Sequence, residues 1–213
     1  MVQLPRCRWL ILVLMLASAP AVAQAVPASI TAAGIGPVRL TDTEATLAAR
    51  IGSRQLVRAD LPIGEGFCAP GSRVFPGTDR ELEVVWSDST RSRIVAVGAR
   101  QPKSPWRTAA GVGVGTTLAE LERIAGKAIV FSGFGWDYGG GAPWAEPGLE
   151  AGLDLFPDPA SEQKVAGDPR YRETQGERSV SSDHPVIRAM IVRVDRIVVA
   201  GPARRESEFP CRR

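Results

Sequence analysis

The sequence predicts an α+β fold of two tandem related units, each with a short helix or helical hairpin packed on a small antiparallel sheet. Two internal similarities lead to this prediction. Residues 38–52 align without gaps on residues 112–126, with identical residues at Val38/Val112, Thr43/Thr117, Ala45/Ala119, Leu47/Leu121 and Gly52/Gly126. Residues 93–98 resemble residues 196–201. Repetition at a long period is typical of duplicated units. The predicted organisation is a signal peptide at 1–23, a first unit at 24–103 and a second unit at 104–213, with a long polar insertion at about 157–185.

The first segment of the chain is typical of a secretory leader. Arg6 and Arg8 precede an apolar run at 9–17 that is too short for a stable membrane span, which needs about 20 residues. Small residues allow cleavage after Ala23 or Ala25, and we favour Ala23. Cys7 lies before the apolar run, where it cannot serve as a lipoprotein anchor. The alternative is an uncleaved N-terminal anchor.

The leader predicts an exported protein, and the charge that remains without it bears on the partners. Removing Arg6 and Arg8 takes 26 basic residues to 24, against 23 acidic residues, so the mature chain is nearly neutral. No basic face follows a helix or groove, which argues against nucleic acid as a partner. We expect a periplasmic or secreted protein with no stable membrane insertion after processing.

Two cysteines remain after the leader is removed. Cys68 and Cys211 would lie in an oxidising compartment, where an even number of thiols favours a bridge. We predict a Cys68–Cys211 disulfide, and the alternative is two separate thiols.

Each unit is predicted to contain one amphipathic helix that ends at glycine. In the second, Thr116 or Thr117 can cap the helix, and Glu120 has capping-box spacing from Thr117. In the first, Asp42 or Thr43 can act as the cap.

Strands are predicted from β-branched and apolar runs bounded by turn formers. Hairpins are expected to join 81–86 with 93–98, and 187–194 with 196–201. Further strands are expected at 56–61, 67–75, 128–132, 134–138 and 153–156. The polar stretch at 157–185 predicts a long surface loop.

The segment 113–127, with the sequence GVGTTLAELERIAGK, resembles the strand-turn-helix opening of the superfamily that contains secreted β-lactamase inhibitor proteins and BamE (SmpA)-like envelope lipoproteins. The resemblance is strong over these residues and weaker in the first unit, where Thr41 stands in place of Gly115. It implies short helices on a small antiparallel sheet and a non-enzymatic, protein-contacting role, and it assigns no functional residue.

Catalytic and metal-binding motifs are sparse. His184 is the single histidine, in a Ser-Ser-Asp-His-Pro run without a nucleophile elbow, and one histidine with two distant cysteines does not form a zinc ligand set. Acidic residues at Asp137, Glu146, Glu150, Asp154 and Asp158 leave paired-carboxylate glycoside hydrolysis as an alternative. Glycines 111, 113 and 115 precede a helix without a Walker lysine, so we expect a tight turn and not a phosphate loop. We expect no cofactor and no metal.

The aromatic and glycine-rich segment 134–144 is the most suggestive candidate site. Alternation predicts a strand that presents Phe134, Trp136 and Tyr138 on one face, with Asp137 opposite. Aromatic side chains beside glycines are typical of interaction loops. The candidate binding residues are Trp136, Asp137, Tyr138 and Trp144. Core packing of Phe134 and Trp136 is the competing interpretation.

The function hypothesis is a non-enzymatic binding protein of the bacterial envelope or periplasm that contacts a protein or envelope component through its loops. A small secreted hydrolase acting on cell-wall glycan or peptide, with Asp137 or His184 involved, is the alternative. A purely architectural envelope protein is a third possibility.

Overall fold

The computed structural model describes residues 29–211, so the predicted signal peptide and its cleavage point lie outside the described residues. The helices are α1 (Glu44–Ile51), α2 (Leu118–Ala125), α3 (Pro159–Val165), α4 (Pro185–Arg188) and the 3-10 helices η1 (Ser53–Gln55) and η2 (Pro169–Thr174). The strands are β1 (Ile30–Thr31), β2 (Gly34–Ile35), β3 (Val38–Arg39), β4 (Leu56–Gly64), β5 (Phe67–Val74), β6 (Leu82–Trp86), β7 (Ile94–Ala99), β8 (Val130–Ser132), β9 (Gly141–Glu146), β10 (Leu149–Pro157), β11 (Ser179–Ser181), β12 (Val192–Ala200) and β13 (Phe209–Pro210).

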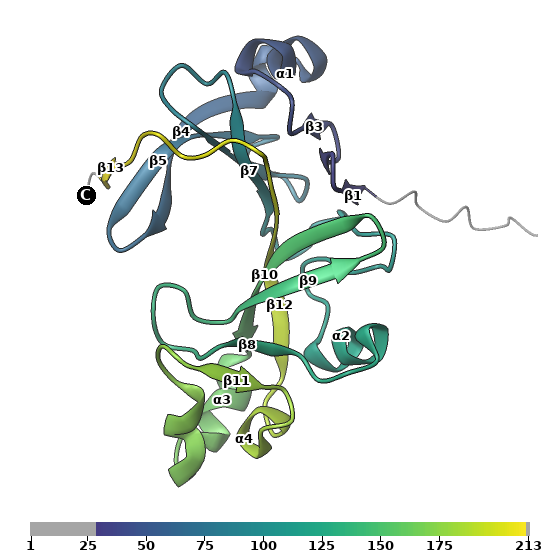
Figure 1. The fold of residues 1–213 in the computed structure, drawn as a ribbon, viewed down its shortest axis with the longest axis vertical. Coiled ribbons are helices and arrows are strands. Elements are labelled where there is room, and N and C mark those ends of the chain that lie inside the picture. The colour runs from purple at the N-terminus through teal and green to yellow at the C-terminus, as the bar shows by residue number, and fades with distance from the viewer. Residues whose placement is uncertain (1–28, 212–213) are drawn as a thin grey trace, which may run out of the picture.

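One eight-stranded antiparallel sheet organises the molecule. Its strand order is β13-β5-β6-β7-β12-β10-β9, and β4 pairs with β5. At the centre, β7 pairs with β12, with Val97 opposite Val199. Figure 1 shows α1 at one end of the long axis and α3 and α4 at the other, with β12 running from the α4 end to the middle of the molecule.

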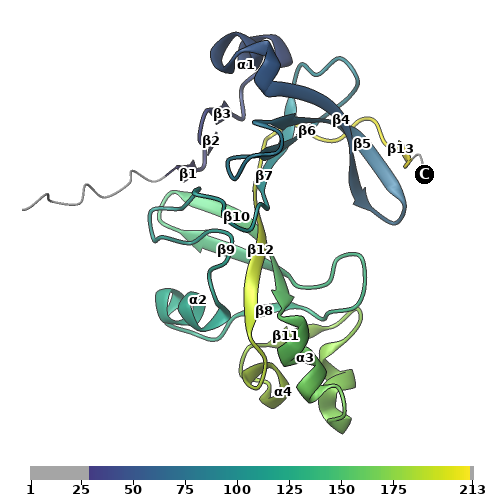
Figure 2. The same cartoon turned by 180° about the vertical axis from the view of Figure 1, so that it is seen from behind.

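The predicted fold class is therefore wrong. The structure is mainly β, and its strands form one large sheet with two small ones, of three and two strands, in place of a separate small sheet for each unit. The two segments that resemble each other, 93–98 and 196–201, lie in strands that pair with one another. This pairing merges the strands of both halves of the chain into one surface, and a view from behind shows the same continuous arrangement (Figure 2).

One face of the large sheet carries the main core. Leu82 and Val84 from β6, and Ile197 and Val199 from β12, are buried together with Leu47 of α1 and Leu121 of α2. Burying a Leu, Ile or Val side chain contributes about 1.5–3 kcal/mol, so these contacts dominate the stability of the fold. Because successive strand residues face opposite sides, Val85 lies on the other face, where a smaller cluster also holds Leu61 and Ala69.

The two predicted helix starts are confirmed. Thr43 caps α1 and Thr117 caps α2, each accepting a bond from the backbone amide three residues on. Glu120 completes the capping box of α2 by accepting from the Thr117 amide at 2.7 Å. Gly126 ends α2 in the left-handed conformation, with φ of 67°.

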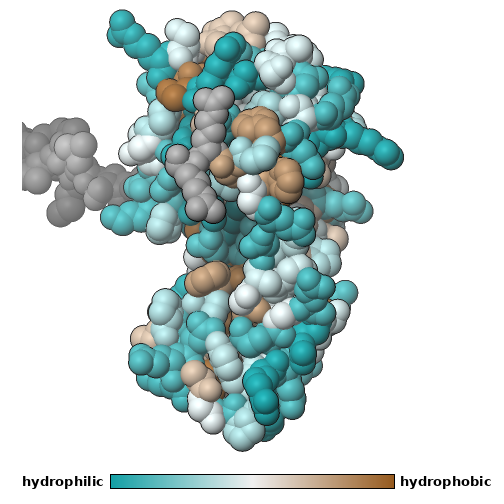
Figure 3. All heavy atoms as spheres, turned by 90° about the vertical axis from the view of Figure 1, so that its left-hand side faces the viewer, coloured by the Kyte–Doolittle hydropathy of each residue, from teal (hydrophilic) through white to brown (hydrophobic). Residues whose placement is uncertain are grey.

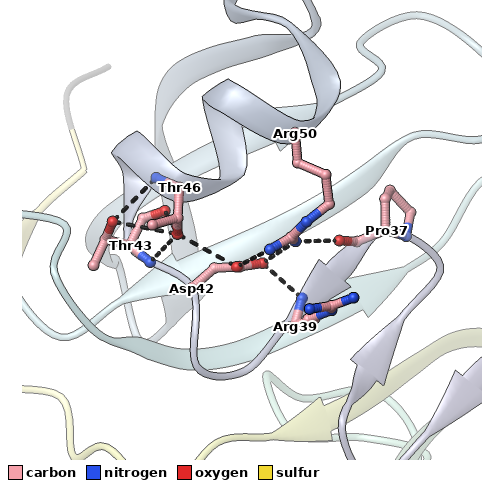
Figure 4. A network of polar contacts seen from close by, with 6 residues as sticks. All are labelled: Pro37, Arg39, Asp42, Thr43, Thr46 and Arg50. Carbon is pink, nitrogen blue, oxygen red and sulfur yellow. Dashed lines mark hydrogen bonds and ion pairs between the residues drawn. The ribbon is translucent and has the colours of Figure 1, made fainter.

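A partly buried ion pair fixes the first helix to the segment before it (Figure 4). The Asp42 side chain is 4% exposed, and its two oxygens accept bonds from Arg50 at 2.6 Å each. The Arg39 amide also donates to Asp42, at 2.8 Å. Burial raises the pKa of Asp42, but the bonds from Arg50 and Arg39 outweigh it, so the net pKa is below its ordinary value. Asp42 therefore acts here as a structural anion.

The strand predictions are confirmed for part of the chain. The hairpin of 81–86 with 93–98 is present as β6 and β7. The second predicted hairpin is wrong, because α4 occupies part of 187–194 and residues 192–200 form one continuous strand. The residues expected at its turn, Asp195 and Arg196, instead form a bulge in β12 opposite Asp154.

The prediction of a surface loop at 157–185 is also wrong. This segment contains α3, η2 and β11 and the start of α4. Asp158, Asp168 and His184 cap these helices, and each is followed by proline at the first helical position. A cap followed by proline is a helix-start signal, because an N–H in the first turn has no partner within the helix, and proline, which lacks an N–H, loses no hydrogen bond there.

The predicted disulfide is confirmed. Cys68 on β5 is bonded to Cys211, 143 residues further along the chain. The bond holds the C-terminal segment against the sheet, where β13 pairs with the start of β5. None of the helices in the described residues is long and apolar enough to cross a membrane.

Candidate functional site

A hollow lined by aromatic side chains lies beside the segment that the sequence singles out. Its volume is about 500 Å³. The lining residues, which we call the aromatic site, are Phe134, Gly135, Trp136, Gly139, Phe156, Pro157, Glu162, Tyr171 and Gln175. They come from the β8–β9 loop (133–140), the end of β10, α3 and η2 with its C-terminal residue. Mainly apolar hollows of this size with a few polar groups are typical ligand sites.

Backbone hydrogen bonds hold the β8–β9 loop in place. The Phe134 amide donates to the Thr174 carbonyl at 2.8 Å, and the Gly176 amide donates to the Phe134 carbonyl at 2.8 Å. The Leu155 amide donates to the Gly140 carbonyl at 2.9 Å. The loop is thus fixed both to the segment after η2 and to β10, so the site is formed by a well-connected loop.

Close packing explains the glycine at position 140. Gly140 has φ of 77°, a conformation that side chains rarely adopt, and a Cβ atom there would overlap the Leu155 carbonyl oxygen. Gly148 has the same φ of 77°, but nothing lies within 4 Å of a Cβ placed on it. Gly140 is therefore required for close approach of two chain segments as well as for its backbone conformation.

A phenol and a carboxylate form the polar part of the hollow. The Tyr171 hydroxyl donates to Glu162 Oε1 at 2.6 Å. Burial and the neighbouring Glu162 raise the pKa of Tyr171 to about 12. The phenol therefore stays protonated at neutral pH and remains a donor to the carboxylate.

The four sequence-predicted binding residues lie in different surroundings. Trp136 lines the hollow and donates its indole N–H to the Gly133 carbonyl at 2.8 Å. Tyr138 is 47% exposed and lies edge-on to Trp136, with ring centroids 5.3 Å apart. The Asp137 carboxylate accepts a bond from the Glu65 amide in the β4–β5 turn. Trp144 lies on β9, is 4% exposed and does not line the hollow, so the structure brings together only part of the set.

The predicted strand at 134–138 is wrong. These residues form turns between β8 and β9, apart from a single bridge at Phe134. Gly135 has φ of 81° and Gly140 has φ of 77°, and neither value belongs to an extended strand. Phe134 packs into the core and lies 5.3 Å from Phe131 by ring centroids, as the competing core interpretation expects for that residue.

Sequence reasoning missed five residues of the site: Phe156, Pro157, Glu162, Tyr171 and Gln175. Four of them belong to the segment 157–185, which was predicted to be a surface loop. The caps and prolines of α3 and η2 would have indicated ordered structure there. Phe156 had no such signal in the sequence, because its exposure of 60% near the end of β10 is visible only in the structure.

His184 and its neighbours do not form a catalytic triad. The His184 ring accepts a bond from the Val186 amide through Nδ1, and its Nε2 lies 3.0 Å from Glu173. Ser182 Oγ is bonded to Glu122 and accepts from the Ile129 amide at 2.9 Å. These side chains stabilise the α4 region. Within the described residues, neither Ser181 nor Ser182 is hydrogen-bonded to the His184 ring.

The candidate carboxylates are distributed over the molecule. Glu146 and Glu150 line a separate hollow of about 470 Å³ near the β9–β10 turn. Glu146 Oε2 accepts a bond from the Ala110 amide at 3.1 Å, whereas its Oε1 is buried without a hydrogen-bond partner. Asp154 lies 3.4 Å from Arg196, and burial raises its pKa despite that cation. Asp158 caps α3.

A third hollow of about 320 Å³ lies between α2 and α4. Glu122 and Arg188 line it and form an ion pair at 2.7 Å. Arg193 also lines it and donates to the Gly115 carbonyl at 3.4 Å. The turn before α2 is tied to the sheet, because the Gly115 amide donates to the Val194 carbonyl at 2.8 Å.

Among residues 29–211, no group of three or more His, Cys, Asp or Glu side chains is placed to hold a metal ion.

The chain was compared with protein-family models, with curated proteins and with solved structures, and none of these comparisons found a match.

Proposed function

We propose that the chain is an exported binding protein of the bacterial envelope or periplasm, which contacts a partner protein or envelope component through the aromatic site. The observation that carries the proposal is the hollow of about 500 Å³ with Phe134, Trp136, Phe156 and Tyr171 in its lining. Aromatic side chains supply large contact areas at little cost in conformational entropy, which is why they dominate recognition sites.

Exposure of apolar rings supports this proposal. Phe156 and Tyr138 are 60% and 47% exposed and both lie on segments that form or adjoin the hollow. Figure 3 shows that the side of the molecule with the β4–β5 hairpin is largely hydrophilic, with hydrophobic residues in small groups. A ring as open as that of Phe156, set beside a hollow, is a natural contact point.

Photo-crosslinking in the envelope tests the proposal. A photoreactive phenylalanine analogue replaces Phe156 at the site or Val57 on β4, which is a matched control because Val57 is 47% exposed and does not line the hollow. We expect a discrete adduct from position 156 and none from position 57. The adduct should weaken strongly when Trp136→Ala is added. Equal adducts at both positions, or none at 156, would contradict the proposal.

Export is tested separately by sequencing the N-terminus of the protein recovered from the periplasm or medium. Cleavage after Ala23 would leave Gln24 first, and cleavage after Ala25 would leave Val26 first. Recovery of the intact chain from the cytoplasm would contradict export.

A hydrolase acting on cell-wall glycan or peptide is a second candidate function. It is favoured by one observation, namely that Glu146 and Glu150 line the same hollow and that Glu146 has a buried oxygen without a partner. Two carboxylates across a cleft are the usual apparatus of glycoside hydrolysis. The test is release of reducing ends from purified peptidoglycan. Activity that is lost in both Glu146→Gln and Glu150→Gln but kept in Trp136→Ala would support it.

A further inference from the structure

The aromatic site contains a negative charge that no cation neutralises. Glu162 is the one carboxylate in the lining, and the lining contains no Lys or Arg. Its hydrogen bond comes from the neutral hydroxyl of Tyr171. Among the ion pairs within 4.0 Å in the described residues, none involves Glu162.

Tyr171 leaves part of this carboxylate available. Its hydroxyl occupies Glu162 Oε1, whereas Oε2 accepts no hydrogen bond from the described residues. Glu162 is half-buried, and Oε2 is not one of the fully buried polar atoms that lack a partner, so it keeps some contact with solvent. A carboxylate oxygen that is partly open and set beside apolar rings is suited to a donor that carries positive charge.

We propose that the aromatic site binds the cationic end of a lysine or arginine side chain of a partner polypeptide, an inference that rests on the proposed function. The rings of Trp136, Phe156 and Tyr171 attract a cation through their negative faces, and Glu162 supplies the opposite charge. An anionic ligand would be repelled by the same carboxylate. A neutral apolar ligand would remove water from the carboxylate without replacing its hydrogen bonds, which is costly.

The surroundings of the hollow favour a side chain presented by a polypeptide. Gly135 is exposed and lies on the lining, where its backbone can contact an approaching chain. Gln175 also lines the hollow and uses its Nε2 to donate to Thr174 Oγ1 at 3.0 Å, so its carbonyl oxygen remains an acceptor. A volume of about 500 Å³ accommodates an extended basic side chain together with part of the adjoining backbone.

Calorimetric titration of the mature, disulfide-bonded protein tests the proposal with defined probes. The probes are Nα-acetyl-lysine methylamide, the corresponding arginine compound and the neutral Nε-acetyl-lysine compound. We expect the two cationic probes to bind at least about tenfold more tightly than the neutral one. Binding should weaken as ionic strength rises, because salt screens the attraction to an accessible charge.

Variants separate the contribution of charge from that of the rings. Glu162→Gln should sharply reduce the discrimination between cationic and neutral probes, leaving only the part that the rings supply. Phe156→Ala should weaken the cationic probes by about tenfold, and this residue is exposed enough for the variant to fold. Glu177→Gln is the matched control, because Glu177 is an exposed acid of the same segment that does not line the hollow. It should change nothing.

The outcomes distinguish this inference from the proposed function. Equal binding of neutral and cationic probes, or full discrimination in Glu162→Gln, overturns the cation proposal. If no probe binds while the photo-crosslink at position 156 still forms, the cation proposal fails and the proposed function survives. If the crosslink is absent as well, both fail.

Discussion

Removing the disulfide should lower the free energy of unfolding without altering the fold. Cys68 and Cys211 are 143 residues apart, so their bond closes a loop that spans most of the described chain. In the chain-entropy treatment, a loop of this length restricts the unfolded ensemble enough to stabilise the native state by about 5 kcal/mol. This is comparable to the whole stability of many domains, which is about 5–15 kcal/mol.

The folded state should survive the loss, because the C-terminal segment has other contacts. The Cys211 amide donates to the Gly66 carbonyl at 2.9 Å, and the Gly201 amide donates to the Val95 carbonyl at 2.6 Å. Glu206 is also paired with Arg93. The effect of the bond is therefore expected on the unfolded state, with small changes in the native structure.

Urea unfolding of oxidised, reduced and Cys68→Ser/Cys211→Ser protein measures this effect. Trp86, Trp106 and Trp144 are buried, so their fluorescence reports loss of the core. We expect the reduced protein and the double variant to agree with each other and to lie about 5 kcal/mol below the oxidised protein. A double variant within about 1 kcal/mol of the oxidised protein would refute the reasoning, because it would mean that the bond restrains only a tail that detaches freely.

Three further variants test local features by urea unfolding. Gly140→Ala should destabilise the protein by at least about 2 kcal/mol more than Gly148→Ala, because the two glycines share the same φ and differ in the space around Cβ; equal effects would contradict the packing argument. Asp42→Asn should cost about 2 kcal/mol near neutral pH. Because the pKa of Asp42 is lowered on folding, its contribution is present above its ordinary value of 3.8 and is lost as the pH falls through the folded value, so the variant and the native protein should converge in acid. Thr117→Ala should cost about 1 kcal/mol through loss of the cap of α2, and an unchanged stability would refute the capping-box assignment.

Local signals in the sequence predict local structure well. The caps at Thr43 and Thr117 depend on contacts within four residues, and both are present. The β6–β7 hairpin joins segments that are close in sequence, and it is present as well. The disulfide is predictable because the expected export places two cysteines in an oxidising compartment, where they have few alternatives.

The fold class could not be predicted from such signals. It depends on the pairing of Val97 with Val199, strands that lie about a hundred residues apart and show no mutual preference in their own sequences. The similarity between residues 93–98 and 196–201 was interpreted as evidence for two units with separate sheets. The same similarity is compatible with two strands that lie side by side in one sheet. The alternating aromatic residues at 134–138 also led to a wrong prediction of a strand. The positive φ of Gly135 breaks the extended conformation that the alternation suggests.

The segment 157–185 shows why the candidate site was only partly predictable. Its polar composition suggested a solvated loop, but Asp158 and Asp168 start short helices that place Glu162 and Tyr171 against the β8–β9 loop. The loop that attracted attention supplies Phe134 and Trp136, and without this second segment those rings would lack the polar groups that give the hollow its charge. The proposed recognition by the aromatic site therefore depends on two segments that sequence composition places in opposite classes. If the proposal holds, substitutions at Glu162 should change specificity and those at Trp136 should change affinity.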